Sequence, residues 1–324
     1  MNPARPHRLR RHPLPRSRRP SFRFKPPLFF ILFLILLLAS LGIYVHQSRI
    51  SFWQGQGRLT LAVVQSSRVG IFTFDPARGE SLWLPLPNHT QVTLPVYGTY
   101  PATSLWQLGE QEKTDGGHLL TQALQWELGV GVDAYLSSPP TALFESSQPA
   151  NIINQVRTTL AFLTLPKQTN LSLLDQTRFI WQITSLRSDK RKTLNLETAG
   201  LGQRHISPDD QDVFTVDSEL LHVRHSAAFV NSRFSSPPLP ITIINHTQVA
   251  GLAAHVAQVI TSAGGQIAKV ETSPSQPQET GCLLRLPPDT ESYFVAKIIQ
   301  WFNCRQEVFP QKSNPELAFF SSPV

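Results

Sequence analysis

The sequence predicts an α/β protein with three parts: one N-terminal transmembrane helix, a larger region with a central mixed sheet, and a small C-terminal βαββαβ region. Three observations predict this class. An uncharged apolar run follows a basic N-terminus, strand and helix patterns alternate in the middle of the chain, and two strand–helix–strand patterns lie near its end. The expected boundaries are a basic cytoplasmic tail at 1–27, an anchor at 28–46, the larger region at 58–198, a connector at 199–238 and the C-terminal region at 239–311.

The anchor is predicted from residues 28–45, which contain no charged side chain. Eighteen helical residues span roughly 27 Å, close to the thickness of a hydrocarbon core. Eight arginines and Lys25 precede this run and only Arg49 follows closely, so the N-terminus is expected in the cytoplasm and the rest outside it. A cleaved signal peptide is the alternative. The long apolar run and the poor cleavage site at residues 39–41 favour a retained signal anchor in a single-pass protein of the cell membrane.

The charge balance separates the tail from the body. The chain has 29 basic and 22 acidic residues, and removing the nine basic ones before the anchor leaves 20 against 22, a net charge of −2. The body therefore gives no electrostatic case for binding nucleic acid. The tail could be a nucleic-acid arm, but beside a bilayer it is expected to set topology and contact anionic membrane lipid.

Local signals place the elements of the larger region. Asp115 is positioned to cap a helix that ends at Gly129, and Ser172 to cap a second helix that ends near Leu186. Turn residues 75–79 separate two strands of a hairpin. The strands are expected at 58–64, 68–74, 81–84, 130–136 and 192–197, and the helices at 117–128 and 172–186. The signals between 137 and 170 are weak, with a helix expected at 152–165.

The C-terminal region has the clearest local pattern. Its expected strands are 241–245, 266–271, 282–286 and 305–309, and its expected helices are 249–263 and 289–302. The only cysteines are Cys282 and Cys304. An even pair outside the cytoplasm favours one disulfide, which would tie a strand to the end of the second helix. Two buried free thiols remain the alternative, and the pair is a weak case for a metal site.

The start of this region carries a family resemblance. Residues 241–265, ITIINHTQVAGLAAHVAQVITSAGG, contain a strand that ends at Asn245, a short turn, the triplet 251–253 and a helix that ends in Ala263-Gly264. This pattern resembles the start of the LytR C-terminal domain of the LytR-CpsA-Psr (LCP) cell-envelope family. The match covers roughly 70 residues and is fairly specific for a short motif.

A fainter resemblance lies upstream. The segments FTFDPARGESLWLPLPNHTQVTLPVYGTYPATSLWQLGE and GHLLTQALQWELGVGVDAYL resemble the catalytic LCP domain. The resemblance implies transfer of a glycopolymer from polyprenyl pyrophosphate to peptidoglycan, with arginines holding the pyrophosphate and an acidic residue holding a divalent metal. Cations suit this chemistry because they stabilise the charge of a diphosphate leaving group.

The residues at the family's catalytic positions differ in this chain. Where the family has Pro-Arg-Asp-Thr, residues 87–90 are Pro-Asn-His-Thr, and where it has Ser-Asp-Thr, residues 66–68 are Ser-Ser-Arg. We therefore predict a non-catalytic binding or scaffold protein of cell-wall assembly, with no metal site and no cofactor. The alternative is an active, Mg²⁺-dependent phosphotransferase. Peptidoglycan or a polyprenyl-linked glycan is the expected partner in addition to membrane lipid. Transcription regulation ranks last, because the tail has no DNA-reading fold.

Five residues are candidate ligand-binding groups: Arg68, Arg178, Arg187, Asn245 and His246. The three arginines could form a cationic patch, and the alternative is that they are solvated surface charges. His246 could lie at the edge of a binding surface. Trp106 and Trp126 are interpreted as core residues and not as a platform for a sugar.

Overall fold

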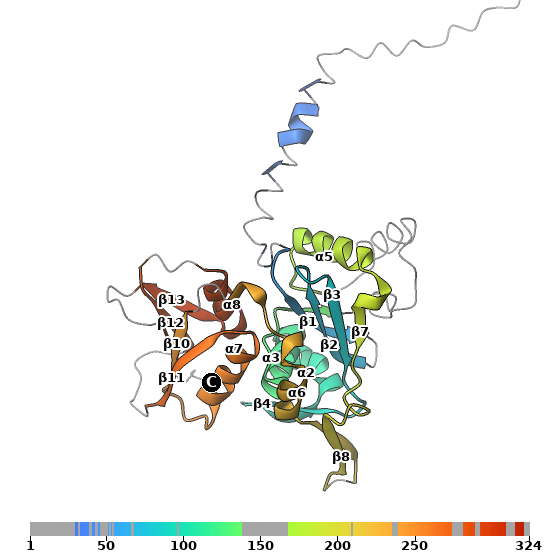
Figure 1. Ribbon diagram of the computed structural model, residues 1–324, viewed down its shortest axis with the longest axis vertical. Coiled ribbons are helices and arrows are strands. Elements are labelled where there is room, and N and C mark those ends of the chain that lie inside the picture. The colour runs from blue at the N-terminus through green and yellow to red at the C-terminus, as the bar shows by residue number, and fades with distance from the viewer. Residues whose placement is uncertain are drawn as a thin grey trace, which may run out of the picture. The chain divides into compact units, whose positions relative to one another are not determined.

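The structure is a computed structural model in which the chain divides into two compact units, Met1–His46 and Gln47–Val324. It describes residues 30, 31, 33–38, 41, 42, 45, 51, 53, 55–65, 68–95, 97–137, 168–208, 210–234, 239–273, 281–288, 292–308 and 315–320. The described residues of the first unit are helical and exposed (Figure 1). Nowhere in the described ranges is a helix both long and apolar enough to span a bilayer. The predicted tail 1–27 and much of the predicted anchor 28–46 lie outside the described residues.

The second unit contains a five-stranded mixed sheet, as the sequence predicted. Its strand order is β6-β1-β2-β3-β7, with β1–β6 and β3–β7 parallel and the other pairs antiparallel. The strands are β1 (Leu59–Gln65), β2 (Arg68–Asp75), β3 (Glu80–Pro85), β6 (Ala134–Ser137) and β7 (Arg191–Thr193). The last two are shorter than expected from the apolar runs around them.

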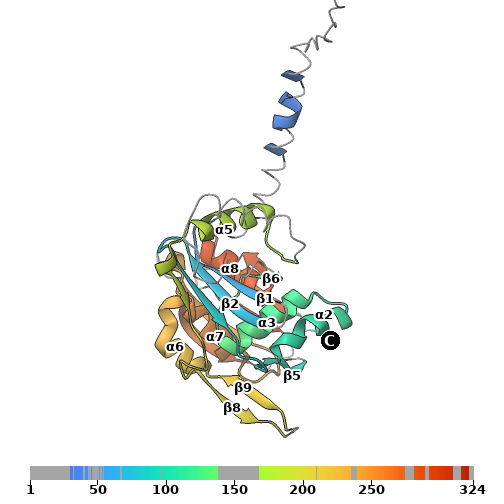
Figure 2. The same cartoon turned by 90° about the vertical axis from the view of Figure 1, so that its right-hand side faces the viewer.

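Helices α3 (Gly116–Leu128) and α5 (Leu173–Ser185) cover opposite faces of this sheet (Figures 1 and 2). Side chains of β1 alternate between the two faces, as a strand buried on both sides requires. Leu61 belongs to the core that contains Phe179 of α5, whereas Ala62 belongs to the core that contains Leu124 of α3.

The predicted helix caps are confirmed. The Asp115 carboxylate accepts a hydrogen bond from the Gly117 amide at 2.9 Å, and Gly129 ends α3 in a left-handed conformation with φ 61°. The Ser172 hydroxyl accepts from the Asp175 amide at 3.1 Å at the start of α5. Each cap depends on residues within one turn, which is why the sequence alone could locate it.

Several elements were not predicted. The structure adds α2 (Leu105–Gln111) and two hairpins, in which β4 (Gln91–Leu94) pairs with β5 (Gly98–Pro101) and β8 (Gly202–Ile206) pairs with β9 (Asp212–Val216). Strand β8 is largely exposed on both faces, so it lacks the alternation that marks a half-buried strand. The helix α6 (Ser218–His225) lies within the predicted connector 199–238, and Asp217 caps it.

The C-terminal part has the predicted βαββαβ order, extended by one strand. Its elements are β10 (Pro240–Asn245), α7 (Leu252–Ser262), β11 (Gln266–Thr272), β12 (Gly281–Leu286), α8 (Tyr293–Phe302), β13 (Cys304–Val308) and β14 (Glu316–Phe320). The sheet order is β11-β10-β14-β12-β13, so the last strand inserts at the centre. Strand β14 lies beyond the predicted end at 311. Helices α7 and α8 share one core with the strands of this second sheet.

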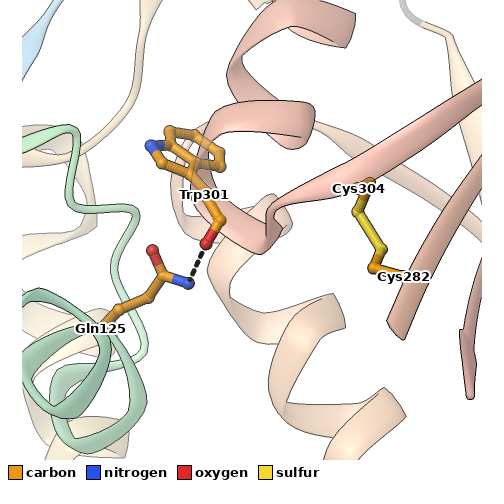
Figure 3. Close-up of a disulfide and its surroundings, with 4 residues drawn as sticks. All are labelled: Gln125, Cys282, Trp301 and Cys304. Atoms are coloured by element: carbon orange, nitrogen blue, oxygen red, sulfur yellow. Dashed lines mark hydrogen bonds between the residues drawn. A yellow bond between two sulfur atoms is a disulfide. The ribbon is translucent and has the colours of Figure 1, made fainter. Parts of the chain in front are cut away.

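Cys282 and Cys304 form the predicted disulfide, with their Cα atoms 4.4 Å apart (Figure 3). The bond joins register partners on the neighbouring parallel strands β12 and β13. It therefore links two strands and not, as expected, a strand and the end of a helix. Only Asn303 separates Cys304 from the end of α8, so the bond also fixes the position at which that helix leads into the sheet.

Candidate functional site

Residues 87–90, which the sequence comparison aligned with the family's Pro-Arg-Asp-Thr motif, form a turn. Asn88 and His89 are exposed, and His89 has a φ of 61°. The Thr90 hydroxyl and amide both donate to the Pro87 carbonyl, at 2.6 and 3.2 Å. The turn is closed by its own hydrogen bonds and contains neither a carboxylate nor a guanidinium. The other substituted positions, Ser66 and Ser67, lie outside the described residues.

The structure separates two of the candidate arginines along β3. Arg68 is exposed at the first position of β2, beside the end of β3, because Gly70 pairs with Pro85. Arg187 lies in the turn that leads into β7, beside the start of β3, because Arg191 pairs with Ser81. The six residues of β3 span roughly 17 Å. These two guanidinium groups therefore do not meet at one ligand.

The candidate arginines also have separate local partners. The Arg187 side chain is 80 % exposed and pairs with Asp189 at 3.0 Å. The Arg178 guanidinium donates to the Ser51 hydroxyl at 3.2 Å and lies 4.0 Å from the Asp175 carboxylate. Arg178 thus packs the start of the second unit against α5. The interpretation of these arginines as local or solvated charges fits these contacts better than a shared patch.

Asn245 and His246 have structural roles between β10 and α7. Asn245 is 2 % exposed, and its amide group donates to the Val249 carbonyl at 2.9 Å and accepts from the Thr247 amide and hydroxyl at 2.8 and 2.7 Å. The His246 ring stacks on Phe320 with a centroid distance of 4.9 Å. The Asn245 side chain therefore shapes the turn, and none of these contacts points to a ligand.

One cavity of about 230 Å³ is lined by basic side chains, among them Arg58, Lys192 and Arg224. Its most buried cation, Arg58, is already engaged. The guanidinium donates to the Asp75 carboxylate at 2.9 Å and to the Val230 carbonyl at 2.9 Å, and burial lowers the pKa of Arg58. Arg58 thus stabilises the fold, and the cavity contains only exposed cations besides it.

The strongest convergence of polar groups lies at the seam between the two sheets, which we define as Asp133 and the α8 residues in contact with it. The Asp133 carboxylate accepts from the Lys297 ammonium at 2.7 Å, the Trp301 indole at 2.8 Å and the Thr60 amide at 2.8 Å. The Asp133 and Lys297 side chains are 3 % and 1 % exposed. The Gln300 amide donates to the Asp133 carbonyl at 2.5 Å. Because the buried Asp133 carboxylate accepts from α8 and from β1 at the same time, the Asp133–Lys297 pair holds α8 against β1 and β6 in one arrangement.

A second set of contacts extends the seam toward α3. The Gln125 amide donates to the Trp301 carbonyl at 3.3 Å (Figure 3). The same side chain accepts from the Val132 amide at 3.3 Å. Gly131 lies so close to the Trp301 indole that a Cβ atom there would overlap the ring. The seam therefore depends on a glycine and an amide that lie close together in the sequence and on an indole far from both.

A cavity of about 240 Å³ opens beside the seam, and we call it the aromatic cavity. It is lined by residues of α3, α7, α8, β14 and the loop between β4 and β5. Its aromatic side chains are Tyr97, Trp126, Trp301, Phe302 and Phe319. Trp126 stacks on His255 with ring centroids 4.0 Å apart, and burial lowers the pKa of His255. Trp126 was interpreted as a core residue, and the structure instead leaves it half-buried at a cavity wall.

Sequence reasoning missed the seam and the aromatic cavity, although one signal was present. Lys297 interrupts the apolar face of α8, between Phe294 and Trp301 at helical spacing, and a lone lysine there requires a buried acceptor. The identity of that acceptor could not be predicted because Asp133 is 164 residues away. Within the described ranges, no three His, Cys, Asp or Glu side chains gather in a way that could hold a metal ion.

Comparisons with known proteins give a likeness to the LCP family. No protein-family model and no curated protein matches the sequence. The crystal structure of TagT from B. subtilis is 16 % identical and matches with a TM-score of 0.37, covering 52 % of this chain and 89 % of TagT. TagV from B. subtilis is 12 % identical with a TM-score of 0.39, covering 52 % and 94 %.

A further match is TagT, described as a LytR-CPS2A-psr family protein, with bound octaprenyl pyrophosphate lipid. It is 15 % identical with a TM-score of 0.39, and the match covers 54 % of this chain and 92 % of that one. The resemblance predicted from the sequence is confirmed as a likeness to this family. Because the TM-scores lie below 0.5, the likeness carries no conclusion about activity or ligands.

Proposed function

We propose that this chain is a membrane-anchored protein of the cell envelope that binds a wall component without catalysing its transfer. Residues 28–46 would form the anchor, with the tail 1–27 in the cytoplasm and the second unit outside it. Residues 58–198 would form an LCP-like domain, and residues 239–320 a LytR C-terminal-like domain. The motif resemblances quoted from the sequence support this placement, together with the nine basic residues before the apolar run.

One observation carries the non-catalytic part of the proposal. At the turn 87–90, an asparagine and an exposed histidine stand where the family has arginine and aspartate, and the candidate arginines lie on separate elements. A pyrophosphate that is cleaved in a phosphotransfer needs cations placed close together around it. Arg68 and Arg187, at opposite ends of β3, do not supply that arrangement.

The test uses the full chain in lipid nanodiscs with Mg²⁺, a polyprenyl pyrophosphate-linked glycan and peptidoglycan as acceptor. We expect the glycan to stay on its lipid and no polyprenyl phosphate, the leaving group of a phosphotransfer, to be released above the level without protein. Turnover that is lost in Arg68→Ala or Arg178→Ala would establish the phosphotransferase alternative. Arg204→Ala is the matched control, because Arg204 is an exposed arginine of β8 that pairs with Glu197 and Asp212.

The anchor is tested separately by fractionation. The full chain is expected to stay with membranes after alkaline extraction, and a variant lacking residues 28–46 to be released. External protease should digest the second unit in spheroplasts and leave the tail 1–27 protected. A full chain that leaves the membrane on alkaline extraction would contradict the proposed anchor.

A further inference from the structure

The aromatic cavity differs sharply in composition from the rest of the chain. Five of the twelve residues that line it are aromatic, whereas aromatic residues make up 9 % of the sequence. The rings come from four separate elements or loops, so no single helix face accounts for their gathering. A concave site with many aromatic walls and a few polar groups is the usual form of a small-ligand site.

The lining also indicates the charge of the ligand. None of the twelve lining residues is Asp, Glu, Lys or Arg. His255 is the one imidazole among them, and burial lowers its pKa, which keeps the ring neutral near pH 7. An anionic group such as a phosphate would have no cation to pair with there, and a cationic group would have no carboxylate, so the lining favours an uncharged ligand.

The polar groups at the rim distinguish a sugar from an alkyl chain. Gln122 is exposed on α3, and Tyr97 is 41 % exposed in the loop between β4 and β5. An amide and a phenol offer donors and acceptors that an alkyl chain cannot use. A saccharide ring can place its C–H face against an aromatic ring such as Trp126 and its hydroxyl edge toward Gln122 and Tyr97.

The walls of the cavity are fixed by the seam. Trp301 is held through its indole by Asp133 and through its carbonyl by Gln125, while Trp126 is held by its stack on His255. Aromatic walls that are already in position lose little conformational entropy when a ligand binds. Because α3 and α7 both line the cavity, a ligand there contacts the structure around both sheets.

We propose that the aromatic cavity binds an uncharged saccharide ring of an envelope glycan, with Trp126 and Tyr97 as its main contacts. This inference rests on the proposed function and names the substrate class and the place at which the chain binds it. Gln122 supplies hydrogen bonds at the rim. The ligand position is distinct from the turn 87–90, where the resemblance to the family would have placed the chemistry.

The test measures binding of an uncharged chitin tetrasaccharide to the full chain in lipid nanodiscs, by saturation-transfer NMR and calorimetry. Trp126→Ala is expected to weaken binding at least about tenfold, since loss of a central aromatic anchor in a binding site has that effect. Tyr97→Ala, in an exposed position that tolerates substitution, is expected to weaken it about threefold or more. Trp181→Ala is the matched control, because Trp181 is 64 % exposed on α5 and does not line the cavity, and it should bind as the wild type does.

Three results would overturn the inference. The first is that the tetrasaccharide does not bind, and the second is that its binding is unchanged in both Trp126→Ala and Tyr97→Ala. The third result is that octanol binds more tightly than the tetrasaccharide and displaces it from the cavity. Failure here is separate from failure of the proposed function. A chain that stays in the membrane and shows no turnover, but does not bind the tetrasaccharide, loses only the cavity assignment. Turnover in the transfer assay would remove the non-catalytic proposal whatever the cavity binds.

Discussion

The turn at 87–90 and the seam around Asp133 differ in how they arrange polar side chains. At the turn, which matches a family motif in sequence position, Asn88 and His89 face solvent and the candidate arginines lie on separate elements. At the seam, which no motif marks, three donors converge on one buried carboxylate. The comparison teaches that a motif resemblance in the sequence does not by itself bring charged side chains together, whereas convergence of donors on one carboxylate identifies where the fold fixes side chains in position.

The largest expected effect concerns the buried ion pair of the seam. Lys297→Met leaves the Asp133 carboxylate buried without its cation, so we expect unfolding to require about 3–5 kcal/mol less free energy. The matched control is Lys192→Met, whose 60 % exposed side chain pairs with Glu80 at 3.6 Å and whose loss should cost less than about 1 kcal/mol. Denaturant titration of both variants measures the difference.

A double variant distinguishes the loss of the ion pair from the loss of side-chain packing at residue 297. In the double variant Asp133→Asn, Lys297→Met, the buried charge is gone, and the single amide oxygen can accept from either Thr60 or Trp301, which bond to different carboxylate oxygens in the wild type. Only part of the stability should therefore return. Equal losses for Lys297→Met and Lys192→Met would contradict the role given to the seam.

The disulfide should rank next. Reduction of the Cys282–Cys304 bond, which closes a loop with a sequence separation of 22, is expected to lower the free energy of unfolding by about 3 kcal/mol. The measurement compares denaturant curves with and without a reducing agent. The double variant Cys282→Ser, Cys304→Ser is the control, because it should start at the lower stability and not respond to reductant. A wild type that is insensitive to reductant would contradict this prediction.

A smaller effect is expected at Asn245, and it tests whether that side chain is structural. Asn245→Ala removes three hydrogen bonds of the β10–α7 turn and should lower stability by about 1–2 kcal/mol without changing saccharide binding. Gln248→Ala, in the same turn but exposed, should stay within about 0.5 kcal/mol of the wild type. A stable Asn245→Ala variant with weakened binding would return Asn245 to the ligand site.

The smallest effect is a pH dependence. Burial lowers the pKa of His255 below its usual value of 6.5, so the unfolded chain takes up the proton first as the pH falls. His255 therefore lowers the stability of the fold progressively below about pH 6.5 and has no such effect above it. The free energy of unfolding should depend less on pH between 7.5 and 5.5 in His255→Gln than in the wild type. Identical pH dependence in the two proteins would show that the ring is not desolvated.

The sequence predicted most features that depend on near neighbours. The caps at Asp115 and Ser172, the end of α3 at Gly129 and the βαββαβ order each depend on local spacing, and the structure confirms them. The mixed character of the first sheet was predicted together with the resemblance to the LCP domain, and the structure has both parallel and antiparallel pairs. The sequence correctly predicted that Cys282 and Cys304 are bonded. It did not predict that the bond joins two neighbouring strands, because strand register is not visible in a sequence.

What the sequence could not predict depends on distant partners. Trp106 and Trp126 have similar local patterns, yet Trp106 packs on Tyr135 while Trp126 stacks on His255, 129 positions along the chain, and lines a cavity. Strand β14 was not predicted, because its place is defined by its pairing with the distant strands β10 and β12. The arginine candidates were chosen by residue type, and the strand register then placed Arg68 and Arg187 at opposite ends of β3.

One measurement compares the turn and the aromatic cavity directly, namely chitin tetrasaccharide binding by the full chain in nanodiscs with two variants side by side. One variant is Asn88→Ala, His89→Gly, in which glycine accepts the positive φ of the turn. The other is Trp126→Ala. We expect the turn variant to bind as the wild type does and the Trp126→Ala variant to bind at least about tenfold more weakly. Loss of binding in the turn variant with full binding in Trp126→Ala would contradict the account and return the site to the turn at 87–90.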